Sequence, residues 1–304
     1  MRSAAATMSG SAGMPMPATC STPRAMRFVI ALPFLWLGIF FLLPFALVLV
    51  IALGTNAPDS VPPVALGFSL KNFTLLFTDD LYLAAWLTSL RIAATSTVVA
   101  LLLGYPMAYA IARAAPARRP LLLMLVVLPF WTSFLIRVYA WMGLLADNGL
   151  LEQFLRWTGL AENPPTIIGT EWAIQLGIVY AYLPFMVLPL YAVLEKLDAS
   201  LLEAAADLGA RPVAAFLTIT LPLSLPGIVA GCLLVFIPAV GEFVIPDLLG
   251  GTETLMIGKV LWDEFFTNGD WALASAVAIC LLALLAGPIA LFQRQQSRSL
   301  ERRT

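Results

Sequence analysis

The sequence is poor in the side chains that carry covalent catalysis or bind metal ions. It contains no histidine, which excludes Ser-His-Asp triads, Cys-His nucleophile systems and most transition-metal sites. The three cysteines are too far apart to predict a zinc site or a redox pair: they are Cys20, Cys232 and Cys280. We interpret Cys232 and Cys280 as small packing residues. The sequence therefore predicts no metal, no cofactor and no enzyme activity in this chain.

One segment is superficially like a phosphate-binding loop. Residues 251–260 include Gly258 and Lys259, but a P-loop needs four residues between its glycines and a Ser or Thr after the lysine. Val260 follows the lysine here. Any nucleotide that drives this protein is therefore expected on a separate polypeptide.

Two ionisable side chains, Arg137 and Glu242, lie within long apolar stretches. A charge inside a bilayer costs about 2.5–3.5 kcal/mol on insertion scales, so such residues usually face a cavity or a partner. We interpret Arg137 as a structural anchor. Glu242 is either a polar residue of a pathway or gate, or a member of a structural ion pair. Aromatic residues flank both charges, either as an interfacial belt or as rings that contact a cation. The candidate pathway residues are Trp131, Tyr139, Glu242 and Phe243.

The composition predicts that these residues are held by helices in a membrane. Of the 304 residues, 61% are hydrophobic and 12% are charged, whereas a soluble domain is about a quarter charged. So few charges cannot cover a soluble surface of this size, and lipid is the expected partner. The net charge of −1 argues against nucleic acid, which binds basic surfaces.

About 20 apolar residues are needed for a helix to cross the hydrocarbon core. Six stretches are long enough, and the fifth is the weakest because Pro226, Pro238 and Glu242 interrupt it. The predicted spans are Phe28–Leu53, Leu90–Ile111, Leu121–Leu145, Trp172–Leu194, Pro226–Ile245 and Trp271–Phe292.

Charge predicts the orientation of these spans. Twelve basic residues lie before span one, between spans two and three, between four and five, and after six, against four on the other side. The positive-inside rule then places both termini in the cytoplasm. Thirteen of the 18 acidic residues lie on the outer side, either as ordinary solvated loops or as a mouth that favours cations. The predicted division is an extension at 1–25, a membrane domain at 26–294 and a tail at 295–304.

The cytoplasmic loop between spans four and five has a distinctive local pattern. Ser200 and Glu203 have the spacing of a capping box, and the alanines after Glu203 favour a helix. Gly209 stands where a left-handed helix cap is needed, and Pro212 suits the first turn of a second helix. The first helix is amphipathic, with Leu201, Leu202, Ala205 and Leu208 on one side. The pattern predicts two helices with a sharp turn between them, and the apolar face either packs on the chain itself or contacts a partner.

The spacing in this loop resembles the EAA signature of binding-protein-dependent ABC importer permeases. Glu203-Ala204-Ala205 is followed after three residues by Gly209, and after nine more by Ile219-x-Leu221-Pro222. The resemblance implies an all-α integral membrane protein with the type I ABC importer permease (MetI-like) fold. It also implies that residues 196–222 form a coupling loop that docks on the ATPase subunits. The coupling residues implied are Glu203, Ala204, Ala205, Gly209 and Arg211.

Further stretches resemble the polyamine subfamily of these permeases. They are Pro129–Trp141, Phe236–Gly251, Ile257-Gly258 and Asp270-Trp271, and the Gly-Glu-Phe-Val-Ile-Pro stretch is most similar to the putrescine-type first permease. This resemblance implies a multi-pass subunit of the bacterial inner membrane that imports putrescine or spermidine. The implied partners are an ATPase dimer that binds ATP and Mg²⁺, a second and different permease, and a periplasmic binding protein.

Two alternatives remain beside this interpretation. One is a permease of an ABC importer for another small solute, since the binding protein does much of the selecting in such systems. An ion-coupled secondary transporter would need inverted repeats and a protonatable or sodium site at mid-membrane, and the six spans contain no convincing duplicated half. A membrane enzyme is a remote alternative, because the sequence lacks histidine, a paired intramembrane carboxylate site and a nucleophile motif.

Overall fold

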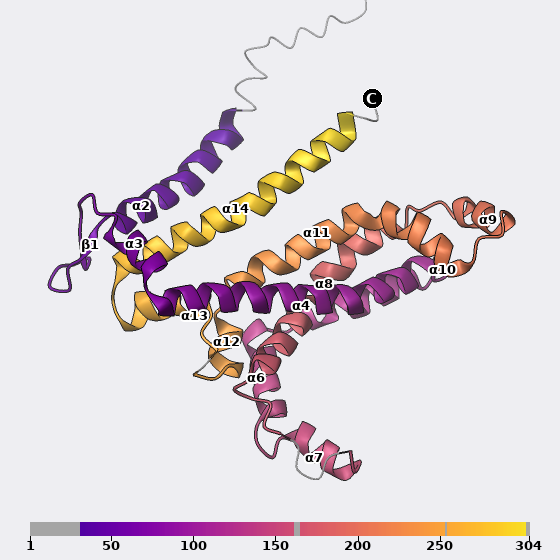
Figure 1. Ribbon diagram of the computed structural model, residues 1–304, viewed down its shortest axis with the longest axis horizontal. Helices are drawn as coiled ribbons and strands as arrows, with labels where there is room; N and C mark the ends of the chain where they lie inside the picture. The colour runs from indigo at the N-terminus through magenta and orange to yellow at the C-terminus, as the bar shows by residue number, and fades with distance from the viewer. Residues whose placement is uncertain (1–30, 161–164, 253, 302–304) are drawn as a thin grey trace, which may run out of the picture. The chain divides into compact units, whose positions relative to one another are not determined.

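The computed structural model describes residues 31–160, 165–252 and 254–301 (Figure 1). The chain divides into two compact units, residues 1–47 and 48–304. The predicted extension at residues 1–25 and the last three residues of the predicted tail lie outside the described part. The predicted division of the chain stays a prediction.

The described part of the first unit is helical. Residues 31–37 are α-helical and lead into a π-helix, η1 (Gly38–Leu42), and then α2 (Leu43–Ala52), which crosses into the second unit. Large apolar side chains of this stretch are exposed, among them Phe34, Trp36 and Phe40. Residues Ala31–Ala52 are long and apolar enough to cross a membrane, which agrees with the first predicted span.

The second unit is built almost wholly from helices, with one short β-hairpin near its start. Strands β1 (Thr55–Asn56) and β2 (Val64–Ala65) pair antiparallel, with Thr55 opposite Ala65. The helices in chain order are α3 (Lys71–Thr78), α4 (Asp80–Arg113), α5 (Arg119–Val127), η2 (Leu128–Trp131), α6 (Phe134–Leu145), α7 (Leu150–Trp157), α8 (Glu171–Leu194), α9 (Ser200–Asp207), α10 (Pro212–Ala215), η3 (Phe216–Thr220), α11 (Leu221–Val240), α12 (Val244–Leu249), α13 (Ile257–Trp262), η4 (Asp263–Thr267) and α14 (Trp271–Glu301).

Three long helices, α4, α8 and α11, pack against one another at the centre of this unit. Met186, Val187 and Leu190 of α8 are buried in one core cluster with Ala100 of α4 and Val235 of α11. When helices associate within a membrane, such side chains move from lipid into the helix interface, and little water is released. Close van der Waals packing must therefore hold the helices together.

Two glycines of α11 allow this close packing. A Cβ atom on Gly231 would lie 2.8 Å from the sulfur of Met186, and one on Gly227 would lie 3.1 Å from the carbonyl oxygen of Pro189. The G-x-x-x-G pair therefore packs on α8 of the same chain.

The third predicted span, Leu121–Leu145, is wrong as a single helix. Residues Arg119–Trp131 and Phe134–Trp157 form a pair of helical segments bent by 86° at a break. Pro129 lies just before this break, where it removes a backbone donor and tightens the chain into the 3₁₀ turn η2. The bend sends α6 and α7 away from the direction of α5.

The fifth predicted span has the wrong limits. The helix runs from Pro212 through η3 and α11 to Val240, and Ile245 belongs to the separate helix α12. The helix ends before Gly241–Phe243: Pro238 weakens the last turn of α11, and Gly241 is the C-cap residue. Glu242 therefore lies between two helices and not within one.

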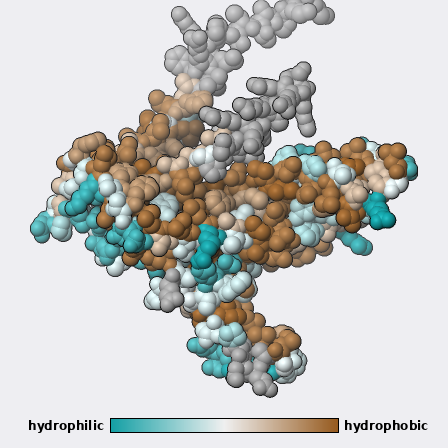
Figure 2. Space-filling view, viewed as in Figure 1, coloured by the Kyte–Doolittle hydropathy of each residue, from teal (hydrophilic) through white to brown (hydrophobic). Residues whose placement is uncertain are grey.

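In the described residues, four helices are long and apolar enough to span a membrane, or five if the bent pair counts as one span. They are Ala31–Ala52, Asp80–Arg113, Glu171–Leu194 and Pro212–Val240. Near the C-terminus, Trp271–Gly287 is a shorter apolar segment within α14. Apolar residues cover most of the visible side of the helices in Figure 2, and hydrophilic residues gather toward the α9–α10 end and near the opposite end.

Candidate functional site

The loop between α8 and α11 forms the two helices and the turn that its sequence predicts. Gly209 has φ of +80°, a conformation that L side chains rarely adopt. The amide of Ala210 donates to the carbonyl of Ala205 (2.9 Å), and the amide of Gly209 donates to Ala206 (2.8 Å). These two bonds form a Schellman motif, which ends α9 and turns the chain toward α10. Pro212 is the first residue of α10, as predicted.

The predicted capping box does not form. Neither the Ser200 nor the Glu203 side chain caps α9. The carboxylate of Asp198 accepts the amide of Ser200 instead (3.0 Å), because it lies two residues earlier in the geometry of an Asx turn. This hydrogen bonding lowers the pKa of Asp198 below that of an ordinary aspartate.

Half of the predicted apolar face of α9 is exposed. Ala205 is buried and Leu202 is half-buried, whereas Leu201 is 44% and Leu208 is 89% exposed. The carboxylate of Glu203 is also exposed, and no hydrogen bond or ion pair involves it in the described part of the chain. The loop thus presents two leucines and a carboxylate on one short helix.

The segment that directly follows α10 is fixed to the bundle by aromatic contacts. The ring of Phe216 in η3 packs edge-on against Tyr105 (5.7 Å between centroids) and Tyr109 (6.2 Å) of α4. The hydroxyl of Tyr105 also lies 2.9 Å from the hydroxyl oxygen of Ser224 in α11. Beside these contacts, Arg119 pairs with Glu195 at the end of α8 (3.2 Å). These contacts connect η3, which continues α10, to α4 and α11.

At the other end of α11, Glu242 is buried and hydrogen-bonded to its own chain. Its side chain is 7% exposed. One carboxylate oxygen accepts the amides of Val244 (3.1 Å) and Ile245 (3.4 Å) at the start of α12, and the other accepts the hydroxyl of Tyr182 in α8. No ion pair formed by the described residues includes Glu242.

Glu242 lies in the wall of an aromatic pocket that joins three parts of the fold. Its volume is about 410 Å³, and it is open on one side. The lining residues come from η2 and α6, from α8, and from the chain around the end of α11: Phe130, Phe134, Ala181, Tyr182, Phe185, Pro238, Gly241, Glu242, Phe243 and Val244. The bend in span three brings Phe130 and Phe134 to this pocket.

The rings of the pocket also contact one another and Arg137. Phe130 lies 5.2 Å from Phe185 between ring centroids, and Phe243 stacks on Trp262 at 4.5 Å. The guanidinium carbon of Arg137 lies 5.3 Å from the Phe130 centroid and 5.7 Å from that of Phe134. These contacts are short enough for cation–π attraction, which suits the predicted role of Arg137 as an anchor.

The structure separates the predicted pathway residues into two groups. Glu242 and Phe243 line the pocket, whereas Trp131 (77% exposed) and Tyr139 (52% exposed) lie outside its lining. Sequence reasoning missed Phe130, Phe134, Tyr182 and Phe185. Phe130 and Phe134 lie within the stretch Pro129–Trp141, which resembles the polyamine permeases. Tyr182 and Phe185 lie in α8, and nothing in the sequence indicates that α8 lies next to Glu242.

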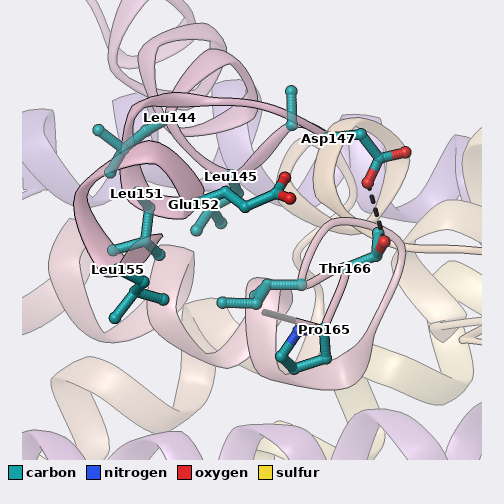
Figure 3. A pocket seen from close by; sticks show the side chains of 10 residues that line it. Leu144, Leu145, Asp147, Leu151, Glu152, Leu155, Pro165 and Thr166 are labelled. Carbon is teal, nitrogen blue, oxygen red and sulfur yellow. Dashed lines mark hydrogen bonds between the residues drawn. The ribbon is translucent and has the colours of Figure 1, made fainter. Parts of the chain in front are cut away.

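Two other hollows are poorly suited to a charged ligand. Figure 3 shows a pocket between the end of α6, α7 and residues 165–167, where the hydroxyl of Thr166 donates to Asp147 (2.8 Å). Its volume of about 10 Å³ is room for about one water molecule. A groove of about 810 Å³ between α4 and α8 has no charged residue in its lining.

Comparison with known proteins gives several full-length relatives, although no family model matches the chain. The spermidine/putrescine transport system permease protein PotB of Haemophilus influenzae is 44% identical over 271 residues, which cover 89% of this chain and 94% of that protein. PotB of Escherichia coli is 42% identical over 268 residues, covering 88% and 96%. The inner membrane ABC transporter permease protein YdcU of Escherichia coli is 32% identical over 75% of this chain.

Solved structures share the fold at much lower identity. A bacterial alginate ABC transporter, in complex with an alginate pentasaccharide-bound periplasmic protein, superposes with a TM-score of 0.65 at 18% identity. The match covers 90% of this chain and 94% of the other. A second structure of a bacterial alginate importer gives a TM-score of 0.62.

Proposed function

The chain belongs to the PotB family of ABC importer permeases, and we propose that it is a permease subunit of an ATP-driven polyamine importer. Its substrate class is putrescine and spermidine, the molecules named for the relatives at 42–44% identity. The observation that carries the proposal is the extent of that identity, which covers 88–89% of this chain and includes both the loop and the pocket.

In this proposal the chain supplies half of a translocation pathway and performs no chemistry itself. ATP and Mg²⁺ bind to a separate ATPase dimer, a second and different permease completes the pathway, and a periplasmic binding protein delivers the substrate. The alginate transporter, which shares the fold, was solved with a periplasmic protein bound, and this supports the last of these partners.

The α9–α10 loop is proposed as the contact with the ATPase. Glu203, Ala204 and Ala205 lie on α9, Gly209 makes the turn, and Arg211 directly precedes α10. The exposed Leu201 and Leu208 offer apolar contact area, and Glu203 offers a charge without a partner in the described residues. The packing of Phe216 on Tyr105 and Tyr109 would then transmit the motion of the ATPase to the helix bundle.

We further propose six membrane spans in the bacterial inner membrane, with both termini in the cytoplasm. The sixth span is α14 and the third is the bent pair. The basic loop after α4 meets the end of α8 through the Arg119–Glu195 pair. Arg91, in the first half of α4, pairs with Glu171, the first residue of α8. Both contacts are consistent with α4 and α8 running in the same direction across the membrane.

The test is uptake of radiolabelled putrescine and spermidine in a strain that lacks this gene, with and without the gene restored on a plasmid. We expect uptake to return with the gene, to require ATP, and to survive collapse of the proton gradient. Uptake that follows the ion gradient without any ATPase subunit would support a secondary transporter. Failure of both polyamines, with a normal amount of protein in the membrane, would point to another solute.

A further inference from the structure

We propose that the aromatic pocket at Glu242 is a subsite for one protonated amino group of the polyamine. This proposal rests on the proposed function and names one position along the pathway where the substrate binds. The carboxylate of Glu242 supplies the charge. The rings of Tyr182, Phe185 and Phe243 supply apolar faces for the adjoining methylene groups and for cation–π contact with the ammonium.

The first argument is the missing counter-charge. A buried carboxylate is costly unless it is paired and hydrogen-bonded. Glu242 is 7% exposed and accepts three hydrogen bonds, all from neutral donors of Tyr182, Val244 and Ile245. No ion pair among the described residues neutralises it. A site that keeps a negative charge unpaired beside an open pocket is suited to a small cation.

The second argument is the remaining hydrogen-bonding capacity. A carboxylate offers about four acceptor positions on its two oxygens, and the described donors fill three of them. The free position is on the oxygen that Tyr182 contacts, since the other already accepts two amides. Glu242 can therefore accept one N–H group from a ligand, which fits a single ammonium group better than a guanidinium fork.

The third argument is that Arg137 contacts only part of the aromatic lining. The Arg137 guanidinium already lies over Phe130 and Phe134, so these two rings carry a resident cation. Phe185 is partly exposed, and Phe243 is stacked on Trp262 on one face only. Tyr182, Phe185 and Phe243 thus remain to contact a second cation near the carboxylate.

The size of the pocket limits what it holds. About 410 Å³ with one open side accommodates an ammonium head and several methylene groups, while one carboxylate neutralises one charge. The second ammonium of a diamine must therefore be neutralised outside the pocket opening, by residues that do not belong to the lining. The chain would contribute one of at least two amine positions along the pathway.

The chain contains a matched control for the carboxylate. The hydroxyl of Tyr82 donates to Glu264 (2.7 Å), which is also a tyrosine–glutamate pair between distant helices. Neither Tyr82 nor Glu264 lines the aromatic pocket. Substitutions Glu264→Gln and Tyr82→Phe change the same kinds of group without touching the proposed subsite.

The experiment measures the initial rate of labelled putrescine uptake against concentration in cells that carry the complete transporter. We expect Glu242→Gln to raise KM or lower uptake by at least roughly tenfold, the factor that corresponds to the loss of one hydrogen bond to a charged group, with a normal amount of protein in the membrane. Phe185→Leu and Phe243→Leu should raise KM by a smaller factor. Glu264→Gln and Tyr82→Phe should behave as the wild type.

The outcomes separate the subsite from the proposed function. If the wild type takes up no polyamine, the proposed function fails and the subsite fails with it. If the wild type transports and Glu242→Gln does no more than Glu264→Gln, the subsite alone is wrong. If Glu242→Gln is lost from the membrane, the two leucine variants decide, and unchanged KM values for both would overturn the proposal.

Discussion

Glu203 on α9 and Glu242 before α12 are both candidate site residues from the sequence, but their environments in the structure are opposite: Glu203 is exposed and Glu242 is buried. Glu203 is exposed on a short helix whose neighbouring leucines are also exposed. Glu242 is buried and accepts hydrogen bonds from α8 and from the start of α12. An exposed carboxylate is available to another protein, whereas an engaged one first maintains its own fold. Loss of either should reduce transport, but by different routes that stability measurements can separate.

The largest expected effect is at the turn of the exposed loop. Gly209→Val places a β-branched side chain at φ of +80°, where an L residue costs about 1–2 kcal/mol. Nothing lies within 4 Å of a Cβ atom there, so the damage comes from backbone conformation alone. We expect loss of uptake with continued ATP hydrolysis by the complex and a normal amount of protein in the membrane. The control is Gly209→Asn, because asparagine tolerates this conformation; equal loss in both variants would contradict the argument.

Glu203→Lys should have the next largest effect, and only on coupling. The side chain has no hydrogen bond or ion pair within the described chain, so its reversal should leave the melting temperature of the purified subunit unchanged. At an interface, a reversed charge meets a like charge or loses its partner. We expect less substrate taken up per ATP hydrolysed in proteoliposomes. Normal coupling in this variant would remove the glutamate from the proposed contact.

Glu242→Ala should have the opposite signature to Glu203→Lys, because it should reduce the stability of the folded subunit. It leaves the hydroxyl of Tyr182 and the amides of Val244 and Ile245 without their acceptor, at about 1–3 kcal/mol for a buried unsatisfied group. We expect a lower melting temperature in detergent. Glu242→Gln keeps one carbonyl acceptor and should lie between alanine and the wild type. A Glu242→Ala protein as stable as the wild type would show that these hydrogen bonds do not hold α12 in place.

The smallest effect belongs to Asp198, which supports the first turn of α9. Its folded pKa is lowered by hydrogen bonds from Ser200, so its contribution is present above the ordinary carboxyl pKa and is lost as pH falls through the lowered value. At neutral pH the contact is complete. Asp198→Ala should therefore increase hydrogen exchange in residues 199–203 at neutral pH with little loss of uptake. Unchanged exchange, after correction for intrinsic rates, would mean that the turn does not depend on this carboxylate.

The same contrast explains how much of the molecule could be predicted from sequence. The α9–α10 loop depends on neighbours in the chain: Gly209 ends one helix and Pro212 starts the next, and both were predicted. The exception is the capping box, because the carboxylate of Asp198, two residues upstream, accepts the Ser200 amide that a capping box assigns to Glu203. Local patterns identify the turn correctly, and they fail where two similar side chains compete for one amide.

The pocket could not be predicted because its parts are distant in sequence. Tyr182 lies 60 residues from Glu242, and Phe130 reaches the pocket only because the third span is bent by 86°. Pro129 was visible in the sequence, but a proline in an apolar stretch does not determine the size of a bend. Apolar length located the membrane helices, and it carries no information about which faces of those helices meet.

The contact of Phe216 with Tyr105 and Tyr109 has a consequence for protein engineering. A chimaera that exchanges residues 196–222 for the same segment of another permease would import one half of this aromatic contact and leave the other half on α4. Such a graft should work only when the recipient helix carries rings of matching size at both tyrosine positions. Exchange of the last three turns of α4, which include Tyr105 and Tyr109, together with the loop is therefore the smallest replacement that we expect to keep this aromatic contact intact.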